Sequence, residues 1–301
     1  MKKSLLLLLV FLLCMTFTGK SPAQEMTEPR ISYDSAKVSY LGPEGTYTQE
    51  ACEVFFDKQG IYIPCKTVND AVQDLIDEKS YYAVIPQENT IGGAVTDYID
   101  TLIAQKGVFV TGEVELSISQ NLLVIPGTKL ENITTVYSHK QGIAQGKEWL
   151  EKNLPDALVL EVSSTAEGAR MVSEGEDPAY AAIASAGCAD VYGLEILASG
   201  IQNNDKNKTR FYVLTLEEPT ASSDSRLAFI ASGSAKDLPA LMTEISRQEM
   251  TLVTIHDRPQ KTELGYYDYL IECSGGSYDK YKELIEKTPF TFRYLGSFNV
   301  R

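Results

Sequence analysis

The sequence predicts an α/β protein with a two-lobed main unit and a smaller unit of the order βαββαβ. Short apolar strands alternate with amphipathic helices from residue 38 onward. A polar break at 217–224 then separates this series from a second series of strands and helices. The chain has 301 residues, 44% of them apolar, which is enough for two compact units with hydrophobic cores of their own.

The first 23 residues have the pattern of a secretory signal peptide. Met1-Lys2-Lys3 is positively charged, residues 5–17 are almost wholly apolar, and Ser21-Pro22-Ala23 places small residues before a cleavage point. We predict cleavage after Ala23 and export to the periplasm or the medium. An uncleaved anchor helix and a lipoprotein modified at Cys14 are the alternatives, although the apolar run is short for a membrane span.

Composition argues against several classes of partner and site. The formal charge is −14, and the predicted signal carries lysines but no acids, so the mature chain would be more acidic still and would offer no basic surface for nucleic acid. Two histidines and the lack of a CxxC pair predict that no metal is bound. Export would permit a disulfide between Cys52 and Cys65, with buried free thiols as the equal alternative.

A polar, irregular linker is expected at 24–37, and the α/β series of the main unit follows it. The expected strands are 38–41, 61–65, 82–86, 134–138, 158–162 and 179–184, and the expected helices are 46–59, 68–78, 94–104, 141–153, 164–174 and 186–192. This alternation predicts parallel sheets with helices on both faces. A long extended crossing within 108–125 divides them into two lobes with a cleft between.

The second unit, residues 225–301, is expected to have four strands and two helices. The strands are 226–231, 251–257, 265–273 and 291–298, and the helices are 238–247 and 278–287. This order over about 75 residues predicts a ferredoxin-like unit.

Four loops of the main unit follow strands, where open α/β sheets bind their ligands. They are 42–46, 86–93, 138–141 and 163–165. Thr46 is expected at a helix N-terminus, which attracts a carboxylate. Asn89 and Thr90 can donate hydrogen bonds to a ligand or cap a helix. His139 is either an acid–base group or a loop residue.

The last strand of the main unit opens with Lys208-Thr209-Arg210-Phe211. Arg210 offers a planar guanidinium to a carboxylate, and Thr209 offers a short hydroxyl beside it. On its own, this pair does not indicate a particular reaction. It is, however, the last of six motifs that follow one another along the chain. They are Gly42-Pro43-Glu44-Gly45-Thr46, Pro86-x-Glu88-Asn89-Thr90, Tyr137-Ser138-His139-x-Gln141, Ser164-Thr165-Ala166-Glu167, Ala182-Ile183-Ala184-Ser185 and Asn207-x-Thr209-Arg210-Phe211.

This succession resembles the prephenate dehydratase family over 38–216, so a dehydratase domain is expected at 38–218. The resemblance implies a bilobed scaffold like that of type II periplasmic solute-binding proteins. It also implies conversion of prephenate to phenylpyruvate with loss of water and carbon dioxide, in phenylalanine biosynthesis and without a cofactor. By the family's motif Thr209 is the catalytic residue. The residues expected to bind substrate are Glu44, Gly45, Thr46, Asn89, Thr90, Ser138, Gln141, Ser164, Thr165, Arg210 and Phe211.

The tail is similar to the ACT regulatory domain of that family, through Asp257-Arg258-Pro259 and Leu295-Gly296-Ser297. This implies a homodimer or homotetramer with L-phenylalanine as effector. The effector residues would be Leu238, Ala240, Leu241, Asp257, Arg258 and Pro259. Two positions depart from the family pattern. Pro239 replaces a glycine and removes an N–H from the effector turn. Gln120 replaces a histidine and cannot titrate.

Two other functions fit the same residues. One is an exported arogenate dehydratase, and the other is a non-catalytic binding protein for an aromatic compound or an amino acid. An exported dehydratase also needs prephenate outside the cytoplasm, which implies an exported substrate or an exported chorismate mutase.

Overall fold

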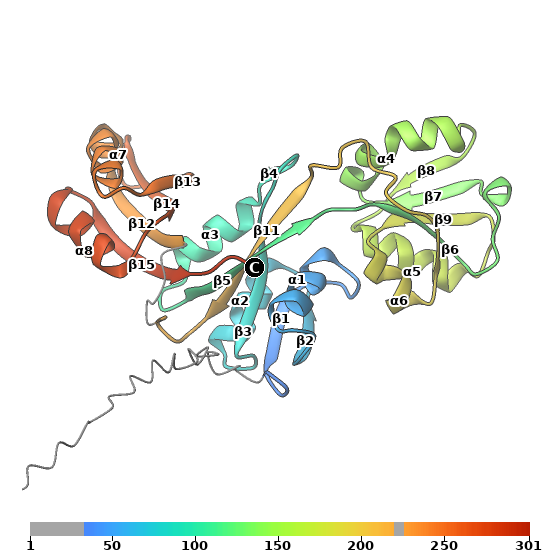
Figure 1. Ribbon diagram of the computed structural model, residues 1–301, viewed down its shortest axis with the longest axis horizontal. Coiled ribbons are helices and arrows are strands. Elements are labelled where there is room, and N and C mark those ends of the chain that lie inside the picture. Colours follow the sequence, from blue (N-terminus) through green and yellow to red (C-terminus); the bar gives the residue numbers. More distant parts are fainter. Residues whose placement is uncertain (1–32, 220–225) are drawn as a thin grey trace, which may run out of the picture. The chain divides into compact units, whose positions relative to one another are not determined.

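The computed structural model describes residues 33–219 and 226–301. The predicted signal peptide, residues 1–23, lies outside the described residues. Three sheets form within them, of six, five and four strands (Figure 1). The described helices include none that is both long enough and apolar enough to cross a membrane.

The first lobe is built on a sheet of the order β2-β1-β3-β11-β5, with the short β4 beside β3. Tyr33, within the predicted linker, already packs edge-on against Phe56 of this lobe, with ring centroids 4.9 Å apart. The elements are β1 Lys37–Leu41, α1 Tyr47–Phe55, β2 Ile61–Cys65, α2 Val68–Ile76, β3 Tyr82–Asn89, β4 Gly93–Ala94, α3 Thr96–Ala104, β5 Phe109–Ser117 and β11 Lys208–Thr215.

The second lobe has a sheet of the order β10-β6-β9-β7-β8. Hydroxyl caps start two of its helices, because Ser164 accepts from the N–H of Glu167 and Ser185 accepts from that of Cys188. The elements are β6 Asn121–Val124, the 3-10 turn η1 Leu130–Asn132, β7 Thr135–Ser138, α4 Lys140–Asn153, β8 Leu158–Glu161, α5 Thr165–Gly175, β9 Tyr180–Ala184, α6 Ala186–Tyr192 and β10 Glu195–Ala198.

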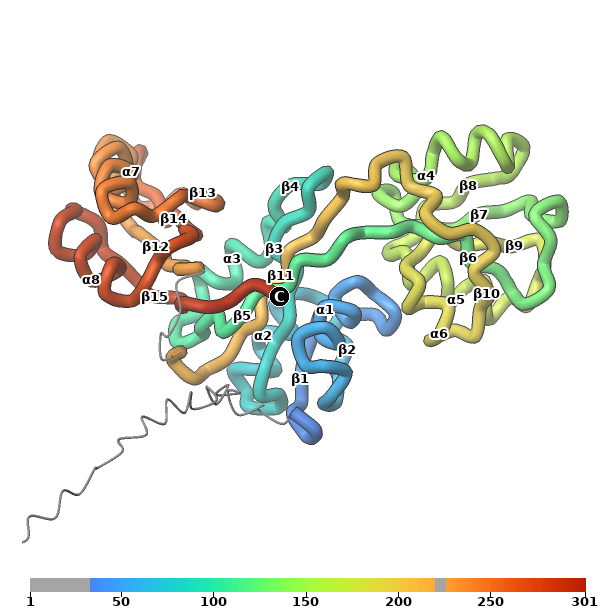
Figure 2. Tube along the Cα trace, viewed as in Figure 1, coloured from blue at the N-terminus to red at the C-terminus, as the bar shows by residue number. Residues whose placement is uncertain are grey.

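Two lobes separated by one extended crossing were expected, and the structure shows two lobes joined by two crossings. The segment after β5 leads to the second lobe and the segment before β11 returns from it (Figure 2). The two lie side by side, because Ile118 N donates to Asn207 O at 2.8 Å and Ile201 N donates to Gln120 O at 2.9 Å.

The expectation of parallel sheets is correct for β2-β1-β3 and β8-β7-β9 but wrong for the strands beside them. β11 is antiparallel to both β3 and β5, and β6 is antiparallel to β9 and β10. The physical reason is the pair of crossings. One leaves the first lobe and the other returns to it, so neighbouring strands at the crossing run in opposite directions.

The C-terminal unit confirms the predicted βαββαβ order, and its antiparallel sheet has the strand order β13-β14-β12-β15. Helices α7 and α8 cover one face, where Leu241 and Leu284 pack against strand residues such as Phe229 and Ile271 (Figure 1). The elements are β12 Arg226–Ser234, the 3-10 turn η2 Ala235–Asp237, α7 Leu238–Arg247, β13 Thr251–Pro259, β14 Tyr266–Ser274, α8 Tyr278–Lys287 and β15 Thr291–Phe298.

The other face of the C-terminal sheet shares a hydrophobic core with the first lobe. Ile230, Leu270 and Leu295 from the C-terminal sheet belong to one buried cluster with Ile85 and Tyr212 from the first lobe. The chain end continues this contact. Glu113 N in β5 donates to Asn299 O at 3.1 Å, and Arg301 N donates to Glu113 O at 2.9 Å.

Candidate active site

Thr209 and Asn89 lie opposite each other on two neighbouring strands. They are register partners in the antiparallel pair β11 and β3. Asn89 Nδ2 donates a hydrogen bond to Thr209 Oγ1 at 2.8 Å, and Thr209 is only 8% exposed. Because the hydroxyl oxygen accepts from Asn89, the hydroxyl proton must point toward another acceptor. The pair therefore presents a sheltered, oriented O–H donor.

The orientation of the Asn89 amide follows from its other contacts. Its Oδ1 accepts from the backbone N–H groups of Ile91 and Gly92, at 3.0 and 2.8 Å. The amide nitrogen must therefore be the atom that faces Thr209, since a flipped amide would lose both of these bonds. The loop after β3 thus fixes the donor that holds the Thr209 hydroxyl.

Asn207 lies beside this pair and is 1% exposed. Its Oδ1 accepts from Asn89 Nδ2 at 2.9 Å, so its own amide nitrogen faces away from Asn89. That nitrogen is buried and has no hydrogen-bond partner among the described residues. A buried donor left without a partner costs free energy, and such a cost is common where a ligand completes the site.

Thr90 is bound to the backbone of the same strand. Its hydroxyl donates to Lys208 O at 3.0 Å and accepts from Lys208 N at 3.1 Å. The backbone N–H of Thr90 donates to the same carbonyl at 2.9 Å. The structure thus gives the Thr90 hydroxyl a role in holding the start of β11, and the predicted contact with substrate stays a prediction.

Arg210 faces the other side of the sheet, because side chains alternate along a strand. Its guanidinium contacts Glu88 at 2.7 Å, Glu272 at 3.1 Å and Glu113 at 3.5 Å. The side chain is only 12% exposed, and Phe211 is 1% exposed within the core of the first lobe. Arg210 is thus directed away from the Thr209 hydroxyl and Phe211 is part of a hydrophobic core, so their predicted binding to substrate gains no support from this geometry.

The turn at 42–46 connects the lobes through its backbone. Gly45 O accepts from Ser185 Oγ at 2.7 Å and from Cys188 Sγ at 3.0 Å, and Glu44 O accepts from Tyr192 OH at 3.0 Å. Gly45 has φ +81°, a conformation that favours glycine, and an added Cβ would lie 2.9 Å from Cys188 Sγ. Thr46 is at the N-cap position of α1, and its hydroxyl donates to Leu41 O at 3.3 Å instead of capping the helix.

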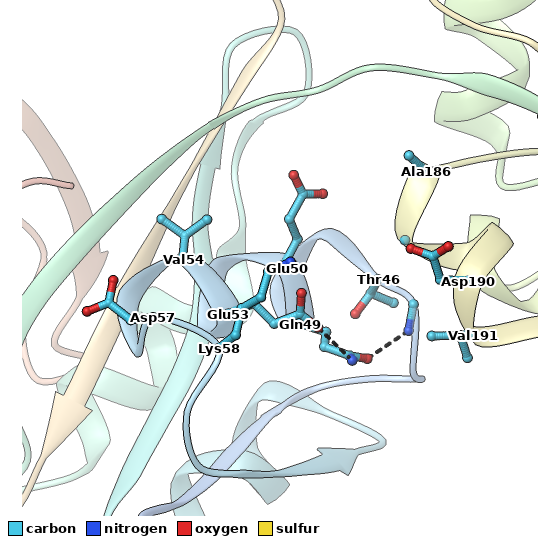
Figure 3. A pocket seen from close by; sticks show the side chains of 12 residues that line it. Thr46, Gln49, Glu50, Glu53, Val54, Asp57, Lys58, Ala186, Asp190 and Val191 are labelled. Atoms are coloured by element: carbon cyan, nitrogen blue, oxygen red, sulfur yellow. Dashed lines mark hydrogen bonds between the residues drawn. The ribbon is translucent and has the colours of Figure 1, made fainter. Parts of the chain in front are cut away.

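A cavity of about 610 Å³ beside this turn lies between α1 and α6 (Figure 3). Four carboxylates line it, from Glu50, Glu53, Asp57 and Asp190, against one ammonium group from Lys58. Its lining includes Thr46 but not Thr209. This negative charge repels a substrate with two carboxylates, such as the expected prephenate. We therefore place the candidate site at Thr209 rather than in this cavity.

Of the predicted residues in the second lobe, Gln141 reaches the loop after β3. A Cβ added to Gly92 would overlap Gln141 Nε2, so this amide lies directly against the Gly92 backbone. Gln141 is in the first turn of α4, and Nδ1 of His139 caps that helix by accepting from Gln141 N at 3.4 Å. A helix N-terminus and an amide donor thus face the Asn89 loop.

The other predicted residues of the second lobe have structural contacts. Ser138 is fully buried and donates to Ile183 O at 2.7 Å. Ser164 caps α5, and Thr165 follows it as the first residue of that helix. Burial and the adjacent Lys140 lower the pKa of His139 below its usual value, which suits a neutral capping ring better than an acid–base group at neutral pH.

Comparisons with known proteins identify relatives over most of the chain. The family model described as prephenate dehydratase matches residues 38–219. The bifunctional chorismate mutase/prephenate dehydratase of Aquifex aeolicus is 35% identical over 269 residues, which are 87% of this chain and 73% of that protein. The chain belongs to the prephenate dehydratase family. The resemblance found in the six sequence motifs is therefore confirmed.

Solved structures share the fold over most of the chain. A prephenate dehydratase from Arthrobacter aurescens, in complex with L-Phe, superposes with a TM-score of 0.77 at 27% identity, covering 87% of this chain and 90% of that one. GqqA, described as a quorum quenching acylase, superposes with a TM-score of 0.79 at 21% identity, covering 88% and 98%. The second likeness concerns the fold alone.

Gln120, at the family's histidine position, is 2% exposed and lies at the crossing between the lobes. Its Nε2 donates to Gln145 Oε1 at 2.8 Å, and its backbone N–H donates to Gln202 Oε1 at 2.9 Å. Gln120 thus joins both crossings to α4, and its own Oε1 has no hydrogen-bond partner among the described residues.

The predicted effector segments belong to α7 and β13. Leu241 is fully buried in α7, whose first turn contains Leu238, Pro239 and Ala240. Arg258, near the end of β13 between Asp257 and Pro259, forms an ion pair of 2.6 Å with Asp100 of α3. Its guanidinium is thus engaged with the first lobe, and effector binding by these residues stays a prediction.

All four described cysteines are free, including Cys52 and Cys65. Cys65 Sγ contacts Ile63 O and Asp74 Oδ2, at 3.7 and 3.6 Å. Residues 33–219 and 226–301 contain no group of three or more His, Cys, Asp or Glu side chains that could hold a metal ion.

Sequence reasoning missed Asn207 as a site residue and missed the partners of Arg210. Asn207 was part of the quoted motif, and its fixed place two residues before Thr209 was the available signal. Glu272 could not be found in this way, because it is 62 residues from Arg210 along the chain and belongs to another domain.

Proposed function

We propose that the chain is a lyase that converts prephenate to phenylpyruvate, water and carbon dioxide, a step of phenylalanine biosynthesis. The reaction breaks the bond between the ring and its carboxylate, and that electron pair completes the aromatic ring. The ring carbon–oxygen bond breaks in turn, and the hydroxyl leaves as water after taking one proton. Since aromatisation drives the reaction, the protein must mainly assist the leaving group and orient the substrate.

The observation that carries this proposal is the hydrogen bond from Asn89 Nδ2 to Thr209 Oγ1, 2.8 Å long. It fixes the hydroxyl oxygen and directs the hydroxyl proton outward, toward the position proposed for the departing oxygen. A fixed donor in a sheltered site stabilises developing negative charge without reorganising. The remaining polar groups, from Asn207 and Gln141, are neutral donors suited to a carboxylate, and α4 adds the partial positive charge of its N-terminus.

The test is formation of phenylpyruvate from prephenate by purified protein. Thr209→Ala should lower kcat by roughly 100- to 1,000-fold, because one transition-state donor is removed. Thr209→Ser keeps the hydroxyl and should retain most of the activity. A wild-type protein without turnover, or a Thr209→Ala variant as active as wild type, would contradict the proposal.

The same assay separates the alternatives. Supplied with arogenate, an arogenate dehydratase would release phenylalanine faster than the protein releases phenylpyruvate from prephenate. A non-catalytic binding protein would bind an aromatic ligand in calorimetry and consume neither compound. The proposal expects turnover of prephenate to be the faster reaction.

We also propose that the mature protein is exported and acts as a homodimer or homotetramer with an ACT-type domain. Export rests on the pattern of residues 1–23, and is tested by the N-terminal mass of protein recovered from the periplasm or the medium.

L-phenylalanine is the proposed effector, since a relative of similar fold is described in complex with it. The exported chorismate mutase as supplier of prephenate is part of this proposal, and the relative that combines both activities supports the link.

A further inference from the structure

The carboxylate of Glu272 is buried where the C-terminal sheet meets the first lobe. Glu272 is in β14 and is 0% exposed. Its neighbours along the strand, Ile271 and Cys273, belong to the core under α7 and α8, whereas Leu270 belongs to the core shared with the first lobe. Since side chains alternate along a strand, Glu272 points toward the first lobe together with Leu270.

Three hydrogen-bond donors and one further cation surround this carboxylate. Its Oε1 accepts from Arg210 Nη1 at 3.1 Å and forms an ion pair with Arg226 Nε at 2.9 Å. Its Oε2 accepts from Tyr212 OH at 2.6 Å and from Gln87 Nε2 at 2.8 Å. An ion buried among apolar side chains is tolerated only when it is fully paired, so this geometry strongly selects one arrangement of the strands around it.

All three hydrogen-bond donors come from the two strands that carry the candidate site. Gln87 is on β3, two residues before Asn89, and Arg210 and Tyr212 are on β11, one and three residues after Thr209. The pairing of these strands shifts at this point, since Arg210 is opposite Glu88 and Phe211 is opposite Pro86. Gln87 is the extra residue of this bulge, and a bulge beside a site re-aims the side chains around it.

Thr209 and Arg210 are consecutive residues on opposite faces of one strand. A displacement of the Arg210 backbone therefore displaces Thr209 and lengthens its 2.8 Å hydrogen bond with Asn89. Resting on the proposed function, we infer that Glu272 is a positioning residue for the reaction. It holds β3 and β11 through Gln87, Arg210 and Tyr212 on the sheet face that contacts the C-terminal unit. Asn89 and Thr209 are thereby kept in register on the opposite face.

Glu272→Gln tests this, because it keeps the size of the side chain and removes the charge that Arg210 and Arg226 require. We expect kcat for prephenate to fall by roughly 10- to 100-fold, since a small misplacement of a reacting group has effects of this size. KM should change by less than about threefold, because the proposed carboxylate donors are untouched. Hydrogen exchange of the backbone amides at 207–211 should become faster.

The matched control is Glu244→Gln. Glu244 is another buried glutamate of the C-terminal unit, 6% exposed, and it pairs with Lys287 at 3.1 Å away from the first lobe. This variant should leave kcat and the exchange of 207–211 unchanged. A general loss of domain stability would affect both variants, whereas loss of positioning affects only Glu272→Gln.

Tyr212→Phe serves if Glu272→Gln does not fold. It removes one donor to Glu272 and keeps the ring that packs on Phe298 at 5.7 Å. We expect smaller changes of the same kind: kcat should fall a few-fold, and amide exchange at 207–211 should become slightly faster. In the double variant, the effects of Glu272→Gln and Tyr212→Phe should be less than additive, as for groups that act through one contact.

The two readouts separate this inference from the proposed function. If wild type does not consume prephenate, the proposed function fails and the exchange of 207–211 alone decides the positioning role. If Glu272→Gln matches wild type in kcat and in amide exchange, Glu272 does not position the site. A rise in KM with unchanged kcat would also overturn the inference.

Discussion

The two lobes share an α/β plan but differ in what supports them. One of the two hydrophobic cores of the first lobe includes residues of the C-terminal sheet, and the chain end pairs with β5. The cores of the second lobe contain only residues of that lobe, from Leu122 to Ile201. Thr209 and Asn89 are thus on the lobe that the C-terminal sheet braces, while Gln141 comes from the lobe whose cores contain only its own residues.

This difference suggests a division of roles within the proposed reaction. The braced lobe holds the reacting hydroxyl in place, and the second lobe contributes binding groups through a few polar contacts, such as the one between Ser185 and Gly45. Substitutions in the first lobe, where it contacts the C-terminal sheet, should therefore change kcat or stability. Substitutions at contacts between the lobes should change KM.

After Thr209→Ala, the largest effect is expected at Asn89. Asn89→Ala removes the donor to Thr209 and the acceptor of two backbone N–H groups, so kcat should fall by roughly 100-fold. Gln141→Ala is its counterpart in the second lobe and should raise KM by up to about tenfold with little change in kcat. Steady-state kinetics with prephenate measures both. Equal effects on kcat would remove the distinction between the lobes.

A smaller effect is expected at Gly296, where β15 approaches β5. A Cβ added there would overlap Val110 O, so Gly296→Ala should lower the free energy of unfolding by about 1–3 kcal/mol. Gly187→Ala, on α6 of the second lobe, meets no atom closer than Ser185 Oγ at 3.8 Å and should be neutral or slightly stabilising. Urea unfolding measures the stability of both variants. A Gly296→Ala variant as stable as wild type would contradict the close contact between β15 and β5.

Glu113 should make the stability of the braced lobe depend on pH. Burial, with the Glu272 carboxylate nearby, raises the pKa of Glu113 to about 8, while Arg210 and Arg226 oppose the shift. A folded pKa above the ordinary value means that the stabilising contribution is complete below about pH 4.5 and is lost as the pH rises through about 8.

Glu113→Gln cannot ionise, so it should remove this part of the pH dependence. From about pH 5 to about pH 8 wild type should lose stability relative to the variant, by at most about 1.4 kcal/mol per pH unit, and the difference should then stay constant at higher pH. Urea unfolding at several pH values measures the slope. Glu244→Gln is the control, because Lys287 lowers the pKa of Glu244 and its contribution does not change in this range. Parallel profiles of wild type and Glu113→Gln would contradict the prediction.

The smallest effect is expected at Gln120, between the two lobes. Gln120→His restores the family's residue and can keep one donor to Gln145. Turnover near pH 8 should stay within about threefold of wild type, and it should fall faster than wild type below about pH 6.5, where the buried ring must take up charge. The pH profile of kcat measures this, and a profile identical to that of wild type would show that position 120 does not influence the reaction.

The amino-acid sequence alone determined the order and most of the bounds of the helices and strands. The bounds of β2, α6, α7, α8 and β15 match those predicted, because apolar periodicity and the residues that start a helix act over a few neighbours. The motif order also sufficed to identify the family and to select Thr209 with Asn89. The strand β10 was missed, since Glu195–Ala198 is short and has no fully buried residue.

Only the tertiary structure decided which way each site residue faces. Arg210 follows Thr209 directly, and the sequence could not show that it turns to Glu272 and Glu88 on the opposite face. Nor could it show that the Asn207 amide nitrogen is buried beside Asn89 without a partner of its own among the described residues. These contacts join residues 60 to 185 positions apart, so they depend on strand register, on the bulge at Gln87 and on the seam between domains, which no local pattern encodes.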